Sequence, residues 1–104
     1  MTYIIDIDDT LLIYPDSHLP VKDRGGAERY QDAAPNIIEI GLLNRLYDKG
    51  HTIMIFTGRN WDKYDMTKRQ LESYHIKFHQ IIMGKPQGIH IDSDYKTSLK
   101  ECIW

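Results

Sequence analysis

The chain has a single cysteine, little net charge and no long apolar run, and each of these absences excludes a class of protein. Cys102 is the only cysteine among 104 residues, so no internal disulfide can form, which suits a reducing cytoplasm. A formal net charge of −2 gives no reason to expect nucleic acid or an acidic membrane as a partner. No apolar run approaches the roughly 20 residues that span a bilayer. We therefore expect one cytoplasmic domain, residues 1–104, without nucleic-acid or membrane partners.

The apolar segments alternate between the period of a strand and the period of a helix. Short runs of β-branched and aromatic residues predict strands, and longer runs with apolar residues three or four positions apart predict helices. Strands separated by helices form βαβ units, so the sequence predicts an α/β fold with a parallel sheet and helices on its faces. The predicted strands are 2–7, 51–59, 77–84 and 88–93, and the predicted helices are 35–50, 62–75 and a short tail, 95–102.

The two longer helices carry recognisable end signals. Pro35 suits the first turn of the first helix, and Gly50 suits its C-cap. Asp62 is placed to cap the start of the second helix. Apolar residues recur at helical spacing in the first helix, so we expect it to pack against the sheet; they are Ile37, Ile38, Ile40, Leu42, Leu43 and Leu46.

Polar residues stand at the end of each predicted strand. Ligands of parallel α/β sheets bind just outside the carboxyl ends of the strands, so these residues are expected on one rim. A compensating ligand there also explains why a buried strand carries carboxylates, because an unpaired buried carboxylate is strongly destabilising. In chain order the pairs are Asp6 with Asp8, Thr57 with Gly58, Gly84 with Lys85, and Asp92 with Asp94.

These residue types favour phosphate chemistry assisted by a metal ion. Carboxylates with little nitrogen or sulfur nearby suit Mg²⁺, a hard cation that shares its site with phosphate oxygens. Thr57 and the backbone N–H groups of Gly58 and Arg59 can bind phosphate oxygens, and Lys85 adds a positive charge. The sequence therefore predicts an anion-binding cradle that faces a Mg²⁺ site.

The three aspartates near the amino terminus separate into different roles. Asp6 and Asp8 are two residues apart on an extended chain, so their side chains can point to one side while Asp9 points elsewhere. With Asp6 as nucleophile and Asp8 as general acid and base, a phosphate ester can be cleaved through an aspartyl-phosphate. We expect Asp9 to be a structural turn residue.

Four segments, "DIDDT", "FTGR", "GKP" and "HIDSDY", resemble in this order the motifs of the haloacid dehalogenase (HAD) superfamily. Longer stretches around them are similar to small capless members often described as capsule or polysaccharide biosynthesis phosphatases. The resemblance covers nearly the whole chain and implies a three-layer, Rossmann-like parallel sheet without a cap domain. It also implies a Mg²⁺-dependent phosphatase of a small phosphorylated metabolite, with a sugar phosphate favoured by the family alone.

The resemblance assigns a role to individual residues of these motifs. Asp6 is the nucleophile and, with the backbone carbonyl of Asp8, a metal ligand, while Asp8 is the general acid and base. Thr57 binds the phosphate, and Lys85 steadies the nucleophile and the transferring phosphoryl group. Asp92 is the remaining metal ligand.

The fourth motif departs from the "IDDK" that such relatives usually carry, because this chain has "IDSD" at 91–94. Either Asp94 supplies the second carboxylate one residue later, or Ser93 holds the metal through a water. This departure keeps a pseudoenzyme among the interpretations.

Residues 14–36 are polar and hold three of the four prolines, so we expect a long loop beside Asp8. The loop is too short for a helical cap. Capless relatives accept large substrates or complete the pocket with a neighbouring subunit, so a homo-oligomer is one implication of the resemblance. Lys22, Arg24 and Arg29 are candidates to meet an anionic substrate, and Trp61 is either a substrate-side aromatic or a packing residue.

Two further interpretations stay open at this stage. A non-catalytic phospho-aspartate receiver also combines clustered aspartates, a threonine and a lysine on a parallel sheet. Its acceptor aspartate, however, ends the third strand, whereas Asp6 ends the first. His75 and His79 have the spacing of zinc ligands on a helix, but no matching ligand set completes a tetrahedral site.

Overall fold

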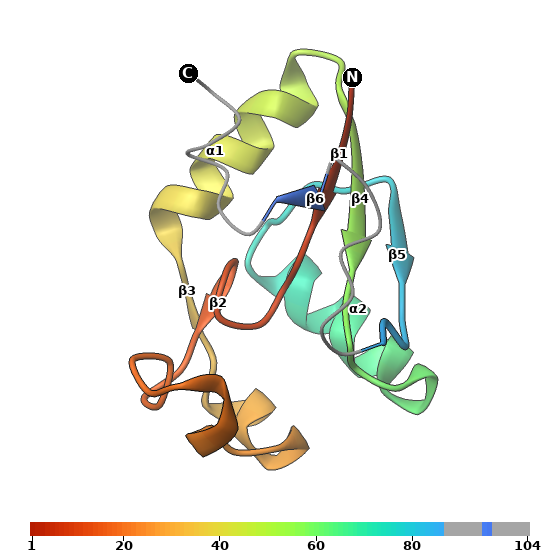
Figure 1. Cartoon of the computed structure of the whole chain (residues 1–104). Coiled ribbons are helices and arrows are strands. Elements are labelled where there is room, and N and C mark those ends of the chain that lie inside the picture. Colours follow the sequence, from red (N-terminus) through yellow and green to blue (C-terminus); the bar gives the residue numbers. More distant parts are fainter. Residues whose placement is uncertain (87–94, 97–104) are drawn as a thin grey trace.

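A four-stranded parallel sheet forms the centre of the protein (Figure 1). The computed structural model describes residues 1–86 and 95–96. The strand order is β5-β4-β1-β6, and every pairing in this sheet is parallel. The α/β class with a parallel sheet and flanking helices is thereby confirmed. The strands are β1 (Thr2–Ile5), β4 (Thr52–Phe56), β5 (Gln80–Ile82) and β6 (Tyr95–Lys96).

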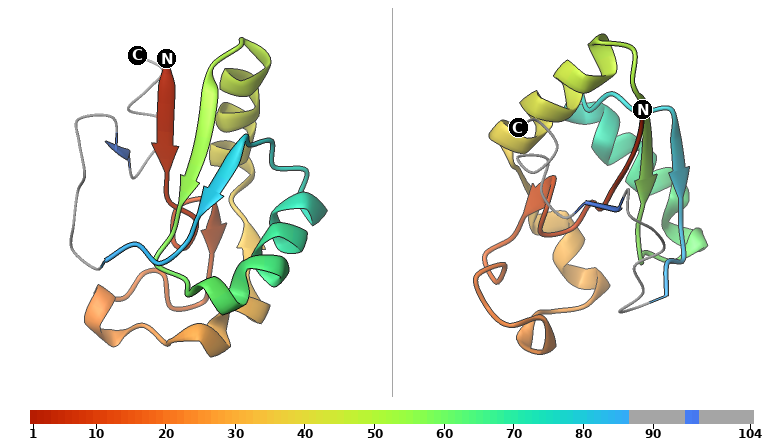
Figure 2. Two further views of the ribbon diagram at one scale, coloured as in Figure 1. Left: turned by 90° about the vertical axis from the view of Figure 1, so that its right-hand side faces the viewer. Right: turned by 45° about the horizontal axis from the view of Figure 1, so that its top comes forward.

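Both helices, α1 (Ile37–Asp48) and α2 (Tyr64–Ser73), cover the same face of this sheet (Figure 2). The chain runs from β1 to β4 to β5 in one direction across the sheet, and right-handed crossovers then place both connecting helices on one side. The described residues thus form two layers, and the third layer of the predicted architecture is not tested by them. No helix in this part of the chain is long and apolar enough to cross a membrane.

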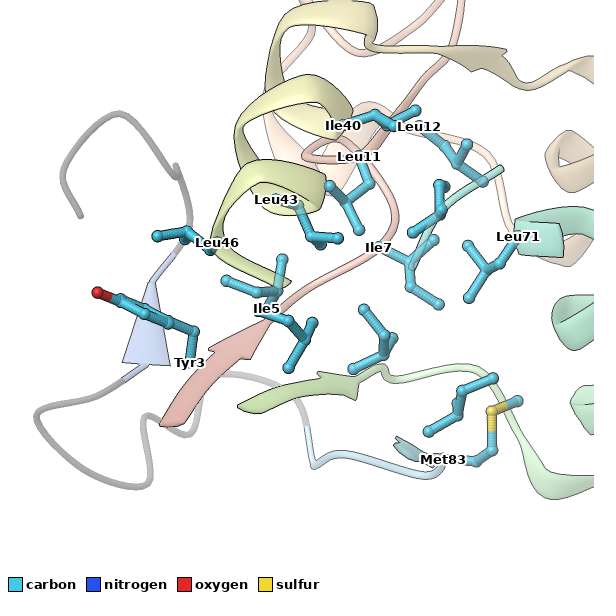
Figure 3. Close-up of a cluster of buried hydrophobic side chains, with 14 of the residues drawn as sticks. Tyr3, Ile5, Ile7, Leu11, Leu12, Ile40, Leu43, Leu46, Leu71 and Met83 are labelled. Atoms are coloured by element: carbon cyan, nitrogen blue, oxygen red, sulfur yellow. The ribbon is translucent and has the colours of Figure 1, made fainter. Parts of the chain in front are cut away.

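The core lies between the sheet and these helices (Figure 3). Neighbouring strands contribute side chains in register, since Ile5 pairs with Ile55 and Ile55 with Ile81, and all three are buried. The predicted packing of the first helix is confirmed at Ile40, Leu43 and Leu46, whereas Ile37 and Ile38 are exposed. Replacing any one of the fully buried leucines by alanine is expected to destabilise the fold by about 2–5 kcal/mol. The fully buried leucines are Leu11, Leu12, Leu43 and Leu71.

The ends of α1 differ slightly from the prediction. Pro35 does not open the helix but pairs with Leu12 in a short antiparallel ladder, and Asn36 is the N-cap, with its side chain accepting from the Glu39 amide. Lys49 is the C-cap, and Gly50 follows it with φ of 93°, a left-handed conformation that glycine adopts without strain.

The predicted cap of α2 is wrong. Asp62 lies inside a 3₁₀ turn, η3 (Trp61–Lys63), that runs directly into α2. A capping side chain needs an extended backbone just before the helix, and Lys63 in that position continues the turn with φ −97° and ψ 8°. At the other end, His75 has φ of 58°, so it takes the left-handed position that glycine usually fills.

The loop at 14–36 is closed at its base by β2 (Leu12–Ile13) pairing with β3 (Ala34–Pro35). Between them lie two 3₁₀ turns, η1 (Val21–Asp23) and η2 (Ala27–Asp32), and no longer element, as expected. The loop lies beyond the carboxyl ends of the parallel strands (Figure 1).

The helical tail predicted at 95–102 is wrong at its start. Tyr95–Lys96 is a strand, with Tyr95 beside Ile4 and Lys96 beside Ile5 at the edge of β1. Pairing with an open strand edge thus overrides the local helical pattern. The remainder of that tail and the strand predicted at 88–93 lie outside the described residues.

Candidate active site

A cleft of about 830 Å³ opens at the carboxyl ends of β1 and β4, between these ends and the 14–36 loop. Five residues predicted from strand ends line it together: Asp6, Asp8, Thr57, Gly58 and Lys85. The expected convergence on one rim is therefore found for these five. The other lining residues are Asp9, Thr10, Arg24, Gly25, Gly26, Arg29, Tyr30 and Arg59.

Asp6 directly follows β1, is partly buried and lines the cleft. Its Oδ1 accepts a hydrogen bond of 2.9 Å from the Ile7 amide. Burial raises the pKa of Asp6 to about 6; Lys85 and this hydrogen bond oppose the rise, while Asp8 adds to it. The Asp6 carboxylate therefore lacks enough positive charge around it, which is the environment a bound cation would correct.

Hydrogen bonds between backbones hold the loops after β4 and β5 together. The Thr57 amide donates to the Ile82 carbonyl at 3.0 Å, and the Lys85 amide donates to the Thr57 carbonyl at 2.9 Å. Thr57 is buried, and its Oγ1 accepts from the Arg59 amide at 3.2 Å, so that amide faces the threonine. Lys85 is thereby fixed near Asp6, where its charge acts on the Asp6 carboxylate.

The side chain of Arg59 is a site residue that sequence reasoning missed, since only its amide was considered. It is 1% exposed and grips Asp8 with two hydrogen bonds, from Nε to Oδ2 at 3.0 Å and from Nη2 to Oδ1 at 2.8 Å. The Tyr14 hydroxyl also donates to Asp8 Oδ1, and burial together with Asp8 raises the pKa of Tyr14 above its usual range. Asp8 is thus held in one orientation by two neighbours.

Asp9 points into the 14–36 loop, as its predicted structural role requires. It has φ of 68°, a left-handed conformation that aspartate tolerates better than most residues. Arg29 grips it at 2.7 and 3.0 Å, Ser17 donates to it, and Arg24 lies 3.2 Å away. Burial would raise the pKa of Asp9, but the hydrogen bonds from Arg29 and Ser17 lower it overall.

The loop arginines therefore have partners within the protein. Arg29 also pairs with Asp16, and its guanidinium lies 4.0 Å from the centre of the Tyr14 ring. Arg24 donates to the Leu19 and Ser17 carbonyls as well. Both arginines line the cleft, but their first role is to fasten the loop to Asp9.

The predicted Mg²⁺ ligands are only partly placed. Asp6 and Asp8 line the cleft, whereas Asp92, Ser93 and Asp94 lie outside the described residues. Within residues 1–86 and 95–96 no three histidines, cysteines or acidic residues gather as a metal site. Of the placed donors, the Asp6 carboxylate fits a hard cation. The side chain of Asp8 is taken by Arg59, which leaves the Asp8 backbone carbonyl as its donor for a metal.

Two other residues that the sequence singled out, His79 and Trp61, do not line the cleft. His79 accepts from the Ile53 amide at 3.0 Å through Nδ1, and its ring stacks on Tyr47, which is a packing role rather than a zinc site. Trp61 is 60% exposed, stacks on Tyr64 and does not line the cleft.

Comparison with protein-family models found no match, and comparison with curated proteins found none either. Two solved structures are similar. A chain of the Pnkp1/Rnl/Hen1 complex shares 22% identity at a TM-score of 0.62, over 88% of this chain and 30% of that one. A crystal structure of an MCSG target from Vibrio cholerae shares 22% identity at a TM-score of 0.61, over 88% of this chain and 78% of that one. This chain thus spans less than a third of the first protein, and likeness at this identity establishes a shared fold.

Proposed function

We propose that the protein is a Mg²⁺-dependent phosphomonoesterase of the HAD type, acting on a small phosphorylated metabolite through an aspartyl-phosphate. The observation that carries this proposal is the meeting of Asp6, Asp8, Thr57, Gly58 and Lys85 in one cleft at the strand ends. These residues come from three segments far apart in the sequence, so their convergence is a property of the fold.

In the proposed reaction the two acidic side chains, Asp6 and Asp8, have separate roles. A carboxylate oxygen of Asp6 attacks phosphorus while the bond from phosphorus to the ester oxygen breaks, and Asp8 gives a proton to the departing alcohol. Asp8 then takes a proton from a water, whose oxygen attacks phosphorus and releases inorganic phosphate and the Asp6 carboxylate. Thr57 and Lys85 bind the phosphoryl oxygens, where their hydrogen bonds and charge stabilise the developing negative charge.

The metal would be held by the Asp6 carboxylate, the Asp8 backbone carbonyl and Asp92, the ligands that the HAD resemblance assigns. When bound, Mg²⁺ supplies positive charge against Asp6 and the phosphate oxygens. The raised pKa of Asp6 supports this assignment, because burial disfavours the charged carboxylate and a bound cation would offset that cost.

One observation favours a second candidate, a non-catalytic phosphate acceptor or pseudoenzyme. Asp8 Oδ1 accepts from Arg59 and from Tyr14, and Oδ2 accepts from Arg59, so one acceptor position on Oδ2 is left for a proton. If this position is closed when substrate is bound, Asp6 can take up phosphate but Asp8 cannot activate the water that would release it.

Hydrolysis of p-nitrophenyl phosphate and of a panel of phosphorylated metabolites, with and without Mg²⁺, tests the proposal. We expect turnover that needs Mg²⁺ and disappears in Asp6→Asn, with a strong loss in Asp8→Asn. Turnover that survives in Asp6→Asn, or that never occurs across the panel, would rule out the enzyme. A stable acyl-phosphate on the wild-type protein would instead support the second candidate.

A further inference from the structure

Gln70, on α2, lies behind the arginine that holds Asp8 and connects it to the 14–36 loop. Its side-chain Oε1 accepts from Arg59 Nη1 at 3.0 Å, and its Nε2 donates to the Tyr30 carbonyl at 2.8 Å. The Tyr30 ring in turn lies against the Arg59 guanidinium, with 3.9 Å from Cζ to the ring centre. One amide group therefore contacts both the arginine and the loop segment that packs on it.

The guanidinium of Arg59 is fully satisfied by its neighbours. An arginine has five N–H donors in a rigid, planar fork. Nε and Nη2 face Asp8 and Tyr14, while Nη1 faces Thr67 at 3.0 Å and Gln70 at 3.0 Å. Because the fork is planar, fixing its Nη1 end on α2 also fixes the direction in which its other end presents hydrogen bonds to Asp8.

We infer that Gln70 is a positioning residue for proton transfer by Asp8, acting through Arg59. Gln70 does not line the cleft and touches no group assigned to the reaction. Arg59, in contrast, lines the cleft and contacts Asp8. With Gln70 in place, Arg59 holds Asp8 beside the cleft in one orientation. Without it, Arg59 loses one acceptor and the Tyr30 carbonyl loses its hydrogen bond to α2, so Arg59 no longer aims Asp8 at the ester oxygen.

This inference rests on the proposed function, and the leaving group of the substrate provides its test. An alkyl phosphate such as glycerol phosphate needs a proton on its departing oxygen, whereas p-nitrophenolate leaves readily without one. The ratio kcat/KM reports the step in which the alcohol departs. A residue that positions the proton donor therefore affects glycerol phosphate much more than p-nitrophenyl phosphate.

The experiment measures kcat/KM of the full chain with both substrates at saturating Mg²⁺ for Gln70→Met, which keeps the length of the side chain without its hydrogen bonds. Gln31→Met is the matched control, since Gln31 is exposed on η2 and outside the cleft. Gln70→Glu restores the acceptor to Arg59. Thr67→Val, which removes the other acceptor of the same nitrogen, takes the place of Gln70→Met if that variant does not fold.

We expect Gln70→Met to lower kcat/KM for glycerol phosphate about 10- to 100-fold and for p-nitrophenyl phosphate less than about 3-fold. Gln70→Glu, which restores the acceptor to Arg59 but not the donor to the Tyr30 carbonyl, should recover part of the loss, and Gln31→Met should behave as wild type. Equal losses with the two substrates, or no loss, would overturn the inference while leaving the proposed function intact. A wild type that hydrolyses neither of these substrates nor any compound of the metabolite panel would overturn both.

Discussion

Replacing Arg59 by methionine is expected to remove a large part of the stability of this protein. The change leaves Asp8 without its two hydrogen bonds from Arg59, and it leaves the acceptors on Thr67 and Gln70 without this donor. The side chains of the pair are 0% and 17% exposed, so water replaces little of what is lost. Breaking a buried pair by removing one partner costs about 3–5 kcal/mol, against about 5–15 kcal/mol for a whole domain.

An exposed ion pair on the same molecule provides the control. Lys77 and Asp48 lie 2.7 Å apart, as close as Arg59 and Asp8 at 2.8 Å, but their side chains are 47% and 58% exposed. Lys77→Met should therefore cost less than about 1 kcal/mol. The contact distance and the introduced methionine are matched, while the pairs differ in burial and in the further hydrogen bonds that Arg59 makes to Thr67 and Gln70.

Urea unfolding followed by circular dichroism measures both variants. With a slope of about 2 kcal/mol per molar urea, Arg59→Met should lower the midpoint by about 1.5–2.5 M and Lys77→Met by less than about 0.5 M. If the two variants lose similar amounts of stability, the buried Asp8–Arg59 pair does not hold the cleft together as argued.

Two further predictions concern a charge and a strained backbone. Because the pKa of Asp6 is raised, its contribution to stability is present below pH 3.8 and is lost as pH rises through about 6. Without metal, the unfolding free energy of wild type relative to that of Asp6→Asn should therefore fall by about 3 kcal/mol over that pH range. Mg²⁺ at pH 7 should raise the melting temperature of wild type and not of Asp6→Asn; equal effects on both would exclude Asp6 as a ligand. His75→Gly should stabilise the fold by about 1 kcal/mol by relieving its φ of 58°, and Gly50→Ala at φ of 93° should destabilise it by a similar amount in the same melts. A destabilised His75→Gly would show that the histidine side chain contributes more than the strain removes.

The sequence predicts the sheet and the rim of the site well, because both depend on local patterns. Buried strand runs and helical spacing indicate βαβ units, and the parallel topology then brings Asp6, Thr57 and Lys85 to the same end of the sheet. The turn role of Asp9 is also local, since aspartate tolerates a left-handed backbone.

What the sequence does not predict depends on contacts between distant segments. Arg59 and Asp8 are 51 positions apart in the sequence. Nothing in "FTGR" indicates that the arginine side chain turns inward and donates hydrogen bonds to Asp8 and to α2. Asp62 fails as a cap because it lies inside the 3₁₀ turn that runs directly into α2. Tyr95–Lys96 becomes a strand because β1 offers an edge, which is a property of the folded sheet.

The central claim, that Asp6 attacks phosphorus, is tested most directly by locating the phosphate on the protein. Asp8→Asn is mixed with p-nitrophenyl phosphate and Mg²⁺, quenched in acid and digested, and the peptides are mapped by mass spectrometry. Because this variant lacks the base for the second step, we predict phosphate on Asp6, and none when Asp6→Asn is added. Hydrolysis by the wild type without any phosphate on Asp6 in this experiment, or with phosphate on another residue, would contradict the account.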